Sequence, residues 1–217
     1  MHLAEAVQAD VESAGRSCTL FNINAADHDA RSQVIEQLGQ VDVLLHSLAF
    51  GSLVPFIGDV TAERPRQLKP KQMTMTLEVM AHTLVWWAQD LVTAGKLGRG
   101  GRIFSMTSSG SIAAIPNYGA VSAAKCALES HTRQLAVELA PHGIAANAIM
   151  AGVTDTPALQ KIPGSDTLKA MAVKRNPHNR LTTVDDVASA LVALSSPGLA
   201  WMTGNVIRVD GGETLVG

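Results

Sequence analysis

The sequence predicts a single α/β domain, residues 1–217, in which a doubly wound parallel sheet carries helices on both faces. Three observations predict this fold. Short apolar runs alternate along the chain with longer segments whose apolar residues recur at helical spacing. The runs at 41–45 and 101–106 are predicted to be buried strands, and the first is apolar almost throughout, as strands are when helices cover both of their faces. The length of 217 residues, 47% of them hydrophobic, suits one domain with its own core.

The first half of the chain is predicted to alternate helix and strand twice. Residues 2–14 and 27–38 have apolar side chains at helical spacing and are predicted helices. Residues 18–23 and 41–45 are short, largely apolar runs and are predicted strands. This order is typical of βαβ units, which build parallel sheets.

The second half continues the same alternation. Apolar spacing and apolar runs predict helices at 73–93, 118–140 and 183–194, and strands at 101–106, 144–149 and 205–209. Thr182 or Thr183 is the predicted N-cap of the third of these helices. The glycine-rich stretch 98–101 precedes a strand and is predicted to turn the chain from helix into strand.

Composition and charge exclude several classes of protein. The net charge of −2 leaves no basic patch of the kind that binds nucleic acid. The longest uncharged runs, 103–124 and 187–207, are interrupted by polar residues, glycine and proline, so no membrane span is expected. No secretory signal is visible, and two cysteines do not form a disulfide framework. A cytoplasmic location is therefore expected.

Polar and small residues follow the predicted strands. They are Asn24, Ser47, Ser108 with Thr107, Gly152, and the segment 210–212. Because α/β sheets bind ligands outside the carboxyl ends of their strands, we expect a binding site there. No G-x-G-x-x-G turn occurs near the start of the chain, so the usual glycine seat for a pyrophosphate is missing.

Ser108, Tyr118 and Lys125 form the constellation that best predicts chemistry. Tyr118 is the only tyrosine and lies ten residues after Ser108; Lys125 follows seven residues later. Seven residues are two helical turns, so Tyr118 and Lys125 share one helix face. A nearby cation lowers the pKa of a phenol, which predicts a tyrosine able to donate a proton. Each residue alone has an ordinary interpretation: a half-buried tyrosine, a solvated lysine, a turn serine.

The order of these motifs resembles the short-chain dehydrogenases/reductases over nearly the whole chain. The resemblance rests on residues 41–45, the Ser/Tyr/Lys set, Asn147-Ala148-Ile149 with the following Ala151-Gly152 and Thr156, and the terminal segment 203–212. It implies a Rossmann-like fold with sheet order 3-2-1-4-5-6-7, in which residues 18–23 are strand 3 and 41–45 strand 4. The first two strands and their Gly-rich turn are then absent, an N-terminally truncated version of the fold.

Three features are similar to one branch of that family, the enoyl-acyl-carrier-protein reductases. The spacing is Tyr-x6-Lys rather than Tyr-x3-Lys, and Val121 occupies the position four before Lys125. The segment 46–50, His-Ser-Leu-Ala-Phe, and the segment 115–118, Ile-Pro-Asn-Tyr, also match the branch. Two departures stand out: Ser108 lies where many members have a second tyrosine, and Met80 replaces a helix asparagine.

The resemblance implies an oxidoreductase that uses NADPH or NADH to reduce trans-2-enoyl thioesters, carried on acyl carrier protein, in fatty acid synthesis. Tyr118, Lys125 and Ser108 are then catalytic, and Phe50, Tyr118 and residues 157–168 contact the acyl chain. The implied cofactor-binding residues are Asn24, Ala25, Ser47, Leu48, Ala49, Lys125, Gly152, Thr154 and Thr156. No metal site is expected, because the histidines lack ligand spacing. A homo-oligomer is expected.

Two other functions stay open at this point. The chain could be another reductase or dehydrogenase of the same superfamily, acting on a carbonyl or an alcohol. It could also be a catalytically deficient, truncated homologue, an interpretation that the missing Gly-rich turn favours.

Overall fold

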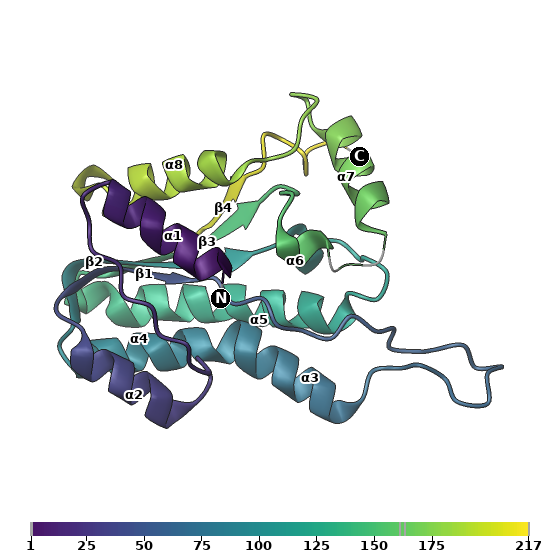
Figure 1. Ribbon diagram of the computed structural model, residues 1–217, viewed down its shortest axis with the longest axis horizontal. Helices are drawn as coiled ribbons and strands as arrows, with labels where there is room; N and C mark the ends of the chain where they lie inside the picture. Colours follow the sequence, from purple (N-terminus) through teal and green to yellow (C-terminus); the bar gives the residue numbers. More distant parts are fainter. Residues whose placement is uncertain (1, 161, 163, 217) are drawn as a thin grey trace.

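A four-stranded parallel sheet forms the centre of the molecule. The computed structural model describes residues 2–160, 162 and 164–216. The strands are β1 Val41–His46, β2 Leu97–Thr107, β3 Ala145–Ala151 and β4 Val206–Val209. Their order across the sheet is β1-β2-β3-β4, every neighbouring pair is parallel, and β1 forms one edge (Figure 1). This confirms the predicted α/β fold with a parallel sheet.

Helices lie on both sides of the sheet. The α-helices are α1 His2–Ser13, α2 His28–Gln37, α3 Pro70–Leu77, α4 Thr83–Thr93, α5 Gly119–Leu139, α6 Pro157–Gln160, α7 Ser165–Arg175 and α8 Val184–Leu194. Short turns of 3-10 helix are η2 Ser109–Ser111, η3 Ala140–His142 and η4 Pro197–Leu199. Figure 1 shows α1 and α8 on one side of the sheet and α2, α4 and α5 on the other. None of the helices in the described ranges is long and apolar enough to cross a bilayer.

Core packing and strand register bring the carboxyl ends of three strands to the same edge of the sheet. Phe104 and Ile149 are fully buried, as are Leu84 of α4 and Leu128 of α5, which pack beneath the strands. In the ladder, His46 pairs with Ser105 and Thr107 with Met150. The carboxyl ends of β1, β2 and β3 therefore lie at one edge of a rigid layer.

The predicted strand at residues 18–23 is wrong. This segment belongs to none of the three ladders, and Leu20 and Ile23 remain exposed. Its described tertiary hydrogen bond comes from the Gln8 side chain to the Cys18 carbonyl, 3.0 Å. A strand needs a hydrogen-bonded neighbour, and within the described residues no strand lies between this segment and β1. For the same reason Val43 and Leu45 on β1 are 41% and 44% exposed.

The glycines at 98–101 lie inside β2 rather than before it. The pairing skips at this point, because Val41 is opposite Leu97 whereas Val43 is opposite Arg102. The four residues 98–101 of β2 thus lie opposite Asp42 alone on β1, a bulge that the three glycines accommodate. The predicted position of the helix-to-strand turn, residues 98–101, is therefore wrong, because the strand has already begun at Leu97, which pairs with β1.

The helix predicted at 73–93 is longer and is interrupted by a wide turn. It begins at Pro70, the N1 position where the missing N–H costs nothing. Between α3 and α4 lies a π-helical turn, η1, Glu78–His82, which contains the buried Met80. Turns of this kind are frequent near functional sites. Elsewhere Thr183 caps α8 with Asp186 in a capping box, one of the two predicted N-caps.

Candidate active site

Tyr118 sits at the start of α5 because the preceding residue reverses the chain. Asn117 has a φ of 63°, in the left-handed region that asparagine tolerates better than most residues. The Tyr118 amide then donates to the Ile115 carbonyl at 3.1 Å, and the Tyr118 carbonyl accepts from Ser122 at 2.8 Å. Tyr118 is thus the N-cap of α5, at the end of the helix nearest the carboxyl edge of the sheet.

Ser108 and Gly110 hold the Tyr118 ring from the other side. Ser108 caps η2, and its hydroxyl accepts from the Gly110 amide at 3.0 Å. A Cβ on Gly110 would lie 2.7 Å from Cε1 of Tyr118. Only a glycine therefore lets the phenol ring pack this close to Ser108, which also hydrogen-bonds the Tyr118 hydroxyl.

Lys125 is buried beneath the site, with 5% of its surface exposed. Its Nζ donates to the Met106 carbonyl at 2.7 Å, which anchors the ammonium to the end of β2. Burial lowers the pKa of Lys125 to about 8, and the negative charge of Glu129 acts in the opposite direction.

The predicted lowering of the Tyr118 pKa is wrong. Burial raises the pKa of Tyr118, and the hydrogen bond from Ser108 opposes this only in part. Lys125 points to the Met106 carbonyl, and no hydrogen bond joins it to Tyr118, although both side chains are described. The phenol therefore keeps its proton at neutral pH, which is the form that can donate a hydrogen bond.

A cavity of about 530 Å³ opens above these residues. It brings together seven of the predicted site residues: Ser47, Ala49, Ser108, Tyr118, Gly152, Thr154 and Thr156. Apolar residues from α6 and α8, including Leu159, Val187 and Leu191, form another part of its wall. The volume lies within the range of small-molecule sites.

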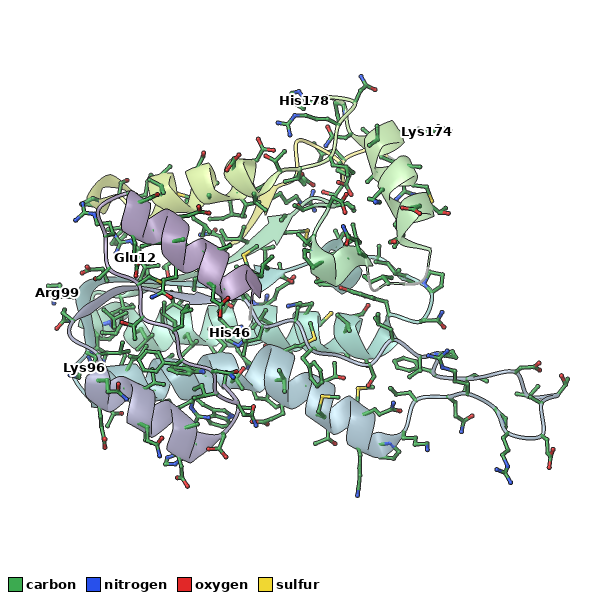
Figure 2. The ribbon with its side chains drawn as sticks, in the orientation of Figure 1. Glu12, His46, Lys96, Arg99, Lys174 and His178 are labelled. Carbon is green, nitrogen blue, oxygen red and sulfur yellow. The ribbon has the colours of Figure 1, made fainter. Side chains whose placement is uncertain are left out.

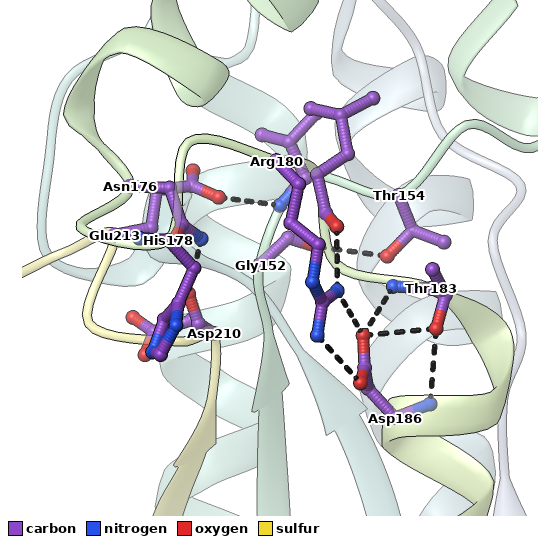
Figure 3. Close-up of polar contacts among 11 residues, drawn as sticks. Gly152, Thr154, Asn176, His178, Arg180, Thr183, Asp186, Asp210 and Glu213 are labelled. Atoms are coloured by element: carbon purple, nitrogen blue, oxygen red, sulfur yellow. Dashed lines mark hydrogen bonds and ion pairs between the residues drawn. The ribbon is translucent and has the colours of Figure 1, made fainter.

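Gly152 forms a wall of this cavity for a steric reason. A Cβ on Gly152 would collide with the Thr182 hydroxyl and lie 2.8 Å from Oε2 of Glu213. The same Glu213 oxygen accepts from the Val153 amide at 2.9 Å, and the Thr154 hydroxyl donates to the Gly152 carbonyl at 3.0 Å. Figure 3 shows this loop near the ion pair that Arg180 forms with Asp186 in the first turn of α8.

The residues present fit one end of a dinucleotide cofactor better than the other. The cavity combines hydroxyl groups, a glycine wall and the nearby ammonium of Lys125, which suits a ribose and a flat nicotinamide ring. In the described ranges, none of the four strands is followed by a G-x-G-x-x-G turn into a helix. A seat for the pyrophosphate of the usual kind is therefore not among them.

Five predicted residues do not line this cavity. Lys125 lies buried beneath it. Asn24 is exposed and Ala25 half-buried in a turn, and Asn24 lines a separate cavity of about 500 Å³ beside α3. The Ala25 carbonyl accepts instead from Nε1 of Trp87 at 3.0 Å. Leu48 is half-buried outside the cavity wall, and Phe50 is 67% exposed.

The predicted acyl-chain segment 157–168 is partly helical. It comprises α6 and the start of α7, and positions 161 and 163 lie outside the described residues. Ala158, Leu159 and Ile162 from this segment line the cavity.

Sequence reasoning missed a buried chain of hydrogen bonds at the end of β1. Nε2 of His46 lies 2.7 Å from the Thr83 hydroxyl, which itself donates to the Val79 carbonyl in the π turn at 2.8 Å. Since that hydroxyl has one hydrogen, His46 carries its proton on Nε2 and donates it to Thr83. Its Nδ1 is buried and has no hydrogen-bond partner among the described residues (His46 is labelled in Figure 2). Burial, followed by the charge of Lys125, lowers the pKa of His46 to about 4.

Thr107 was expected among the polar residues that follow the strands, but its hydrogen bond to Glu129, and Glu129 itself, were missed. The Thr107 hydroxyl donates to Oε1 of Glu129 at 2.6 Å, and Thr107 lines the cavity. The i,i+4 spacing of Lys125 and Glu129 was the available signal in the sequence. No group of three or more metal-ligating side chains occurs in the part of the chain that the structure describes.

Comparisons with known proteins support one family. The sequence profile of the family described as "Enoyl-(Acyl carrier protein) reductase" matches residues 2–214. An enoyl-[acyl-carrier-protein] reductase [NADH] of Aquifex aeolicus (strain VF5) is 31% identical over 182 residues, which are 84% of this chain and 65% of that protein. The chain thus spans slightly less than two thirds of this relative's length. The crystal structure of the Aquifex aeolicus VF5 enzyme superimposes with a TM-score of 0.83 at 27% identity, covering 100% of this chain and 83% of the other.

Two further relatives differ in the reaction that their names state. The 1-cyclohexenylcarbonyl-CoA reductase of Streptomyces collinus is 29% identical over 213 residues, 97% of this chain and 69% of that protein. The L-xylulose reductase of Bos taurus is 32% identical over 211 residues, 94% of this chain and 82% of that protein.

Proposed function

The chain belongs to the enoyl-(acyl carrier protein) reductase family of the short-chain dehydrogenases/reductases, and on this premise we propose that it reduces trans-2-enoyl thioesters. The observation that carries the proposal is Tyr118, a protonated phenol fixed by Ser108 and Gly110 at the wall of a largely apolar cavity. The relatives from Aquifex aeolicus and Streptomyces collinus carry names of reductases acting on enoyl thioesters, which supports this substrate class.

Tyr118 acts on the oxygen side of the substrate. Reduction at the β-carbon of an enoyl thioester leaves negative charge on the thioester oxygen. The Tyr118 hydroxyl, kept protonated by its burial, donates a hydrogen bond to that oxygen. Ser108 orients the phenol, and its partner Gly110 gives the ring room.

Lys125 and the hydroxyl groups of the cavity bind the cofactor. NADH or NADPH supplies the hydride when bound. The residues that would hold its nicotinamide end are Ser47, Ala49, Lys125, Gly152, Thr154 and Thr156. The ammonium of Lys125, anchored to the Met106 carbonyl, provides the positive charge for the ribose hydroxyls.

The apolar wall from α6 and α8 suits an acyl chain, which an acyl carrier protein or coenzyme A presents. Leu159, Ile162 and Leu191 belong to this wall. In this proposal the chain works in fatty acid synthesis, in the cytoplasm and as a homo-oligomer.

A second candidate is reduction of a carbonyl, favoured by the similarity to L-xylulose reductase. The same tyrosine and lysine would serve it, because a ketone oxygen also gains negative charge during reduction.

A comparison of three substrates distinguishes the two candidate functions. The oxidation of NADH and of NADPH is followed at 340 nm with crotonyl-CoA, acetoacetyl-CoA and L-xylulose, using the full chain and Tyr118→Phe. We expect turnover with crotonyl-CoA that the variant loses. Turnover confined to acetoacetyl-CoA or L-xylulose would replace the proposal with the second candidate, and turnover with none of them would contradict both.

A further inference from the structure

Among the described residues around Lys125, the charge of Glu129 favours the protonated form of the lysine. From β2, the Met106 carbonyl accepts from Nζ at 2.7 Å. From β1, His46 faces the ammonium and is uncharged above its pKa of about 4. On α5 itself, Tyr118 is a neutral phenol and Glu129 lies one turn beyond Lys125.

Glu129 is held in place rather than free to move with the solvent. The Thr107 hydroxyl donates to Oε1 of Glu129 at 2.6 Å, which ties the carboxylate to the end of β2. Thr107 directly follows Met106, the residue whose carbonyl anchors Lys125. The helix spacing and the strand therefore fix the Glu129 carboxylate on the side of the Lys125 ammonium.

The energetic consequence follows from burial. A buried ammonium loses hydration, which lowers the pKa of Lys125, and the charge of Glu129 raises it again. The two effects leave the group partly deprotonated near pH 8. A small change in its electrostatic surroundings therefore changes the fraction of charged Lys125 within the physiological range.

We propose that Glu129, held by Thr107, is a positioning residue that keeps Lys125 charged and so sets the upper pH limit of the reaction. The inference rests on the proposed function in assigning the cofactor contact to Lys125. It assigns a role to Thr107 and Glu129, whose mutual hydrogen bond holds the carboxylate beside the end of β2.

The direct test is Glu129→Gln, which removes the charge and keeps the shape. We expect the alkaline limb of kcat/KM to move down by about one pH unit, so that activity falls about fivefold at pH 8 and is nearly unchanged at pH 6. Thr107→Val keeps the charge of Glu129 but removes the hydrogen bond that holds its carboxylate. We therefore expect the alkaline limb to move in the same direction by less. Glu138→Gln, an exposed carboxylate on the same helix, is the matched control and should leave the profile unchanged.

The pKa of Lys125 is measured independently of turnover. The protein is labelled with 13Cε-lysine, the Lys125 signal is assigned by its loss in Lys125→Met, and its shift is followed from pH 6 to 10. A lower midpoint in Glu129→Gln supports the inference even where enoyl reduction is not found. An unchanged midpoint in both Glu129→Gln and Thr107→Val overturns the inference, whatever the activity.

Discussion

The carboxyl end of β1 and its outer edge differ sharply in how completely the rest of the molecule covers them. At its carboxyl end, His46 is 3% exposed, bonded to Thr83, and close to the Tyr118 and Lys125 site. Along its outer edge, Val43 and Leu45 are about two fifths exposed, and the segment 18–23 pairs with no strand among the described residues. The same strand thus carries a finished site at one end and an unpaired flank along its side.

The residues proposed for the reaction and those expected to bind the far end of the cofactor therefore lie in differently ordered parts of the molecule. The groups proposed to act on a reacting oxygen are fixed by glycine contacts and buried hydrogen bonds at the ends of β2 and β3. The residues expected to contact an adenosine, Asn24 and Ala25, lie in a turn away from the main cavity. In this account the nicotinamide end of the site does most of the binding.

The largest expected effect is the loss of the Tyr118 hydroxyl, which probes the finished end. Tyr118→Phe should lower kcat by about 10²–10³, because one donor to a developing oxyanion is worth about 2.7–4 kcal/mol. The ring and its contact with Gly110 remain, so the melting temperature should hardly change. Steady-state rates and thermal melts check both. A variant as active as the parent would remove Tyr118 from the mechanism.

The next effect is a loss of folding stability in acid, which we expect from the buried His46 at the carboxyl end of β1. Its folded pKa of about 4 lies below the ordinary 6.5, so the unfolded chain binds the proton first as the pH falls. Stability is therefore full above pH 6.5 and is lost as the pH falls toward 4, by about 2 kcal/mol between pH 7 and pH 5.

Urea unfolding at pH 7 and pH 5 measures this contribution. His46→Asn should reduce the difference between the two pH values, whereas His142→Asn, at an exposed histidine, should leave it unchanged. An equal loss of stability in His46→Asn and the parent would show that His46 does not titrate as its burial implies.

A smaller effect compares the close packing at Tyr118 with the open flank of β1. Gly110→Ala places a Cβ against the Tyr118 ring and should cost about 1–3 kcal/mol of unfolding free energy. Val43→Thr, on the exposed flank, should stay within about 0.5 kcal/mol. Gly198→Ala meets no atom within 4 Å and controls for the change of residue type. Chemical denaturation measures all three, and a Gly110→Ala cost as small as that of the control would contradict the close packing.

Much of the site could be predicted because it follows from the end of each strand. In a parallel sheet the residues after successive strands meet at one edge, so Ser47, Ser108 and Gly152 were found without knowledge of their contacts. The same rule failed for Asn24, because the strand that it was expected to follow does not form. A strand depends on a distant partner, which local apolar composition does not reveal.

Interactions between elements were out of reach of the sequence for a related reason. The bonds from Thr107 to Glu129 and from His46 to Thr83 join residues 22 and 37 positions apart. The pKa of Tyr118 depends on how deeply the fold buries it, and burial reversed the direction that the nearby lysine suggested. Likewise the skipped pairing at 98–101 arises from the ladder with β1, which glycine content alone does not fix.

We propose that this chain binds its cofactor through the nicotinamide end. The most direct test titrates NADH and reduced nicotinamide mononucleotide, which lacks the adenosine half, into the protein and follows nicotinamide fluorescence. We expect the Kd values of NADH and of the mononucleotide to lie within about threefold of each other, and both ligands to bind more weakly to Lys125→Met. NADH binding more than about thirtyfold tighter than the mononucleotide, or affinities unaffected by the loss of Lys125, would contradict it.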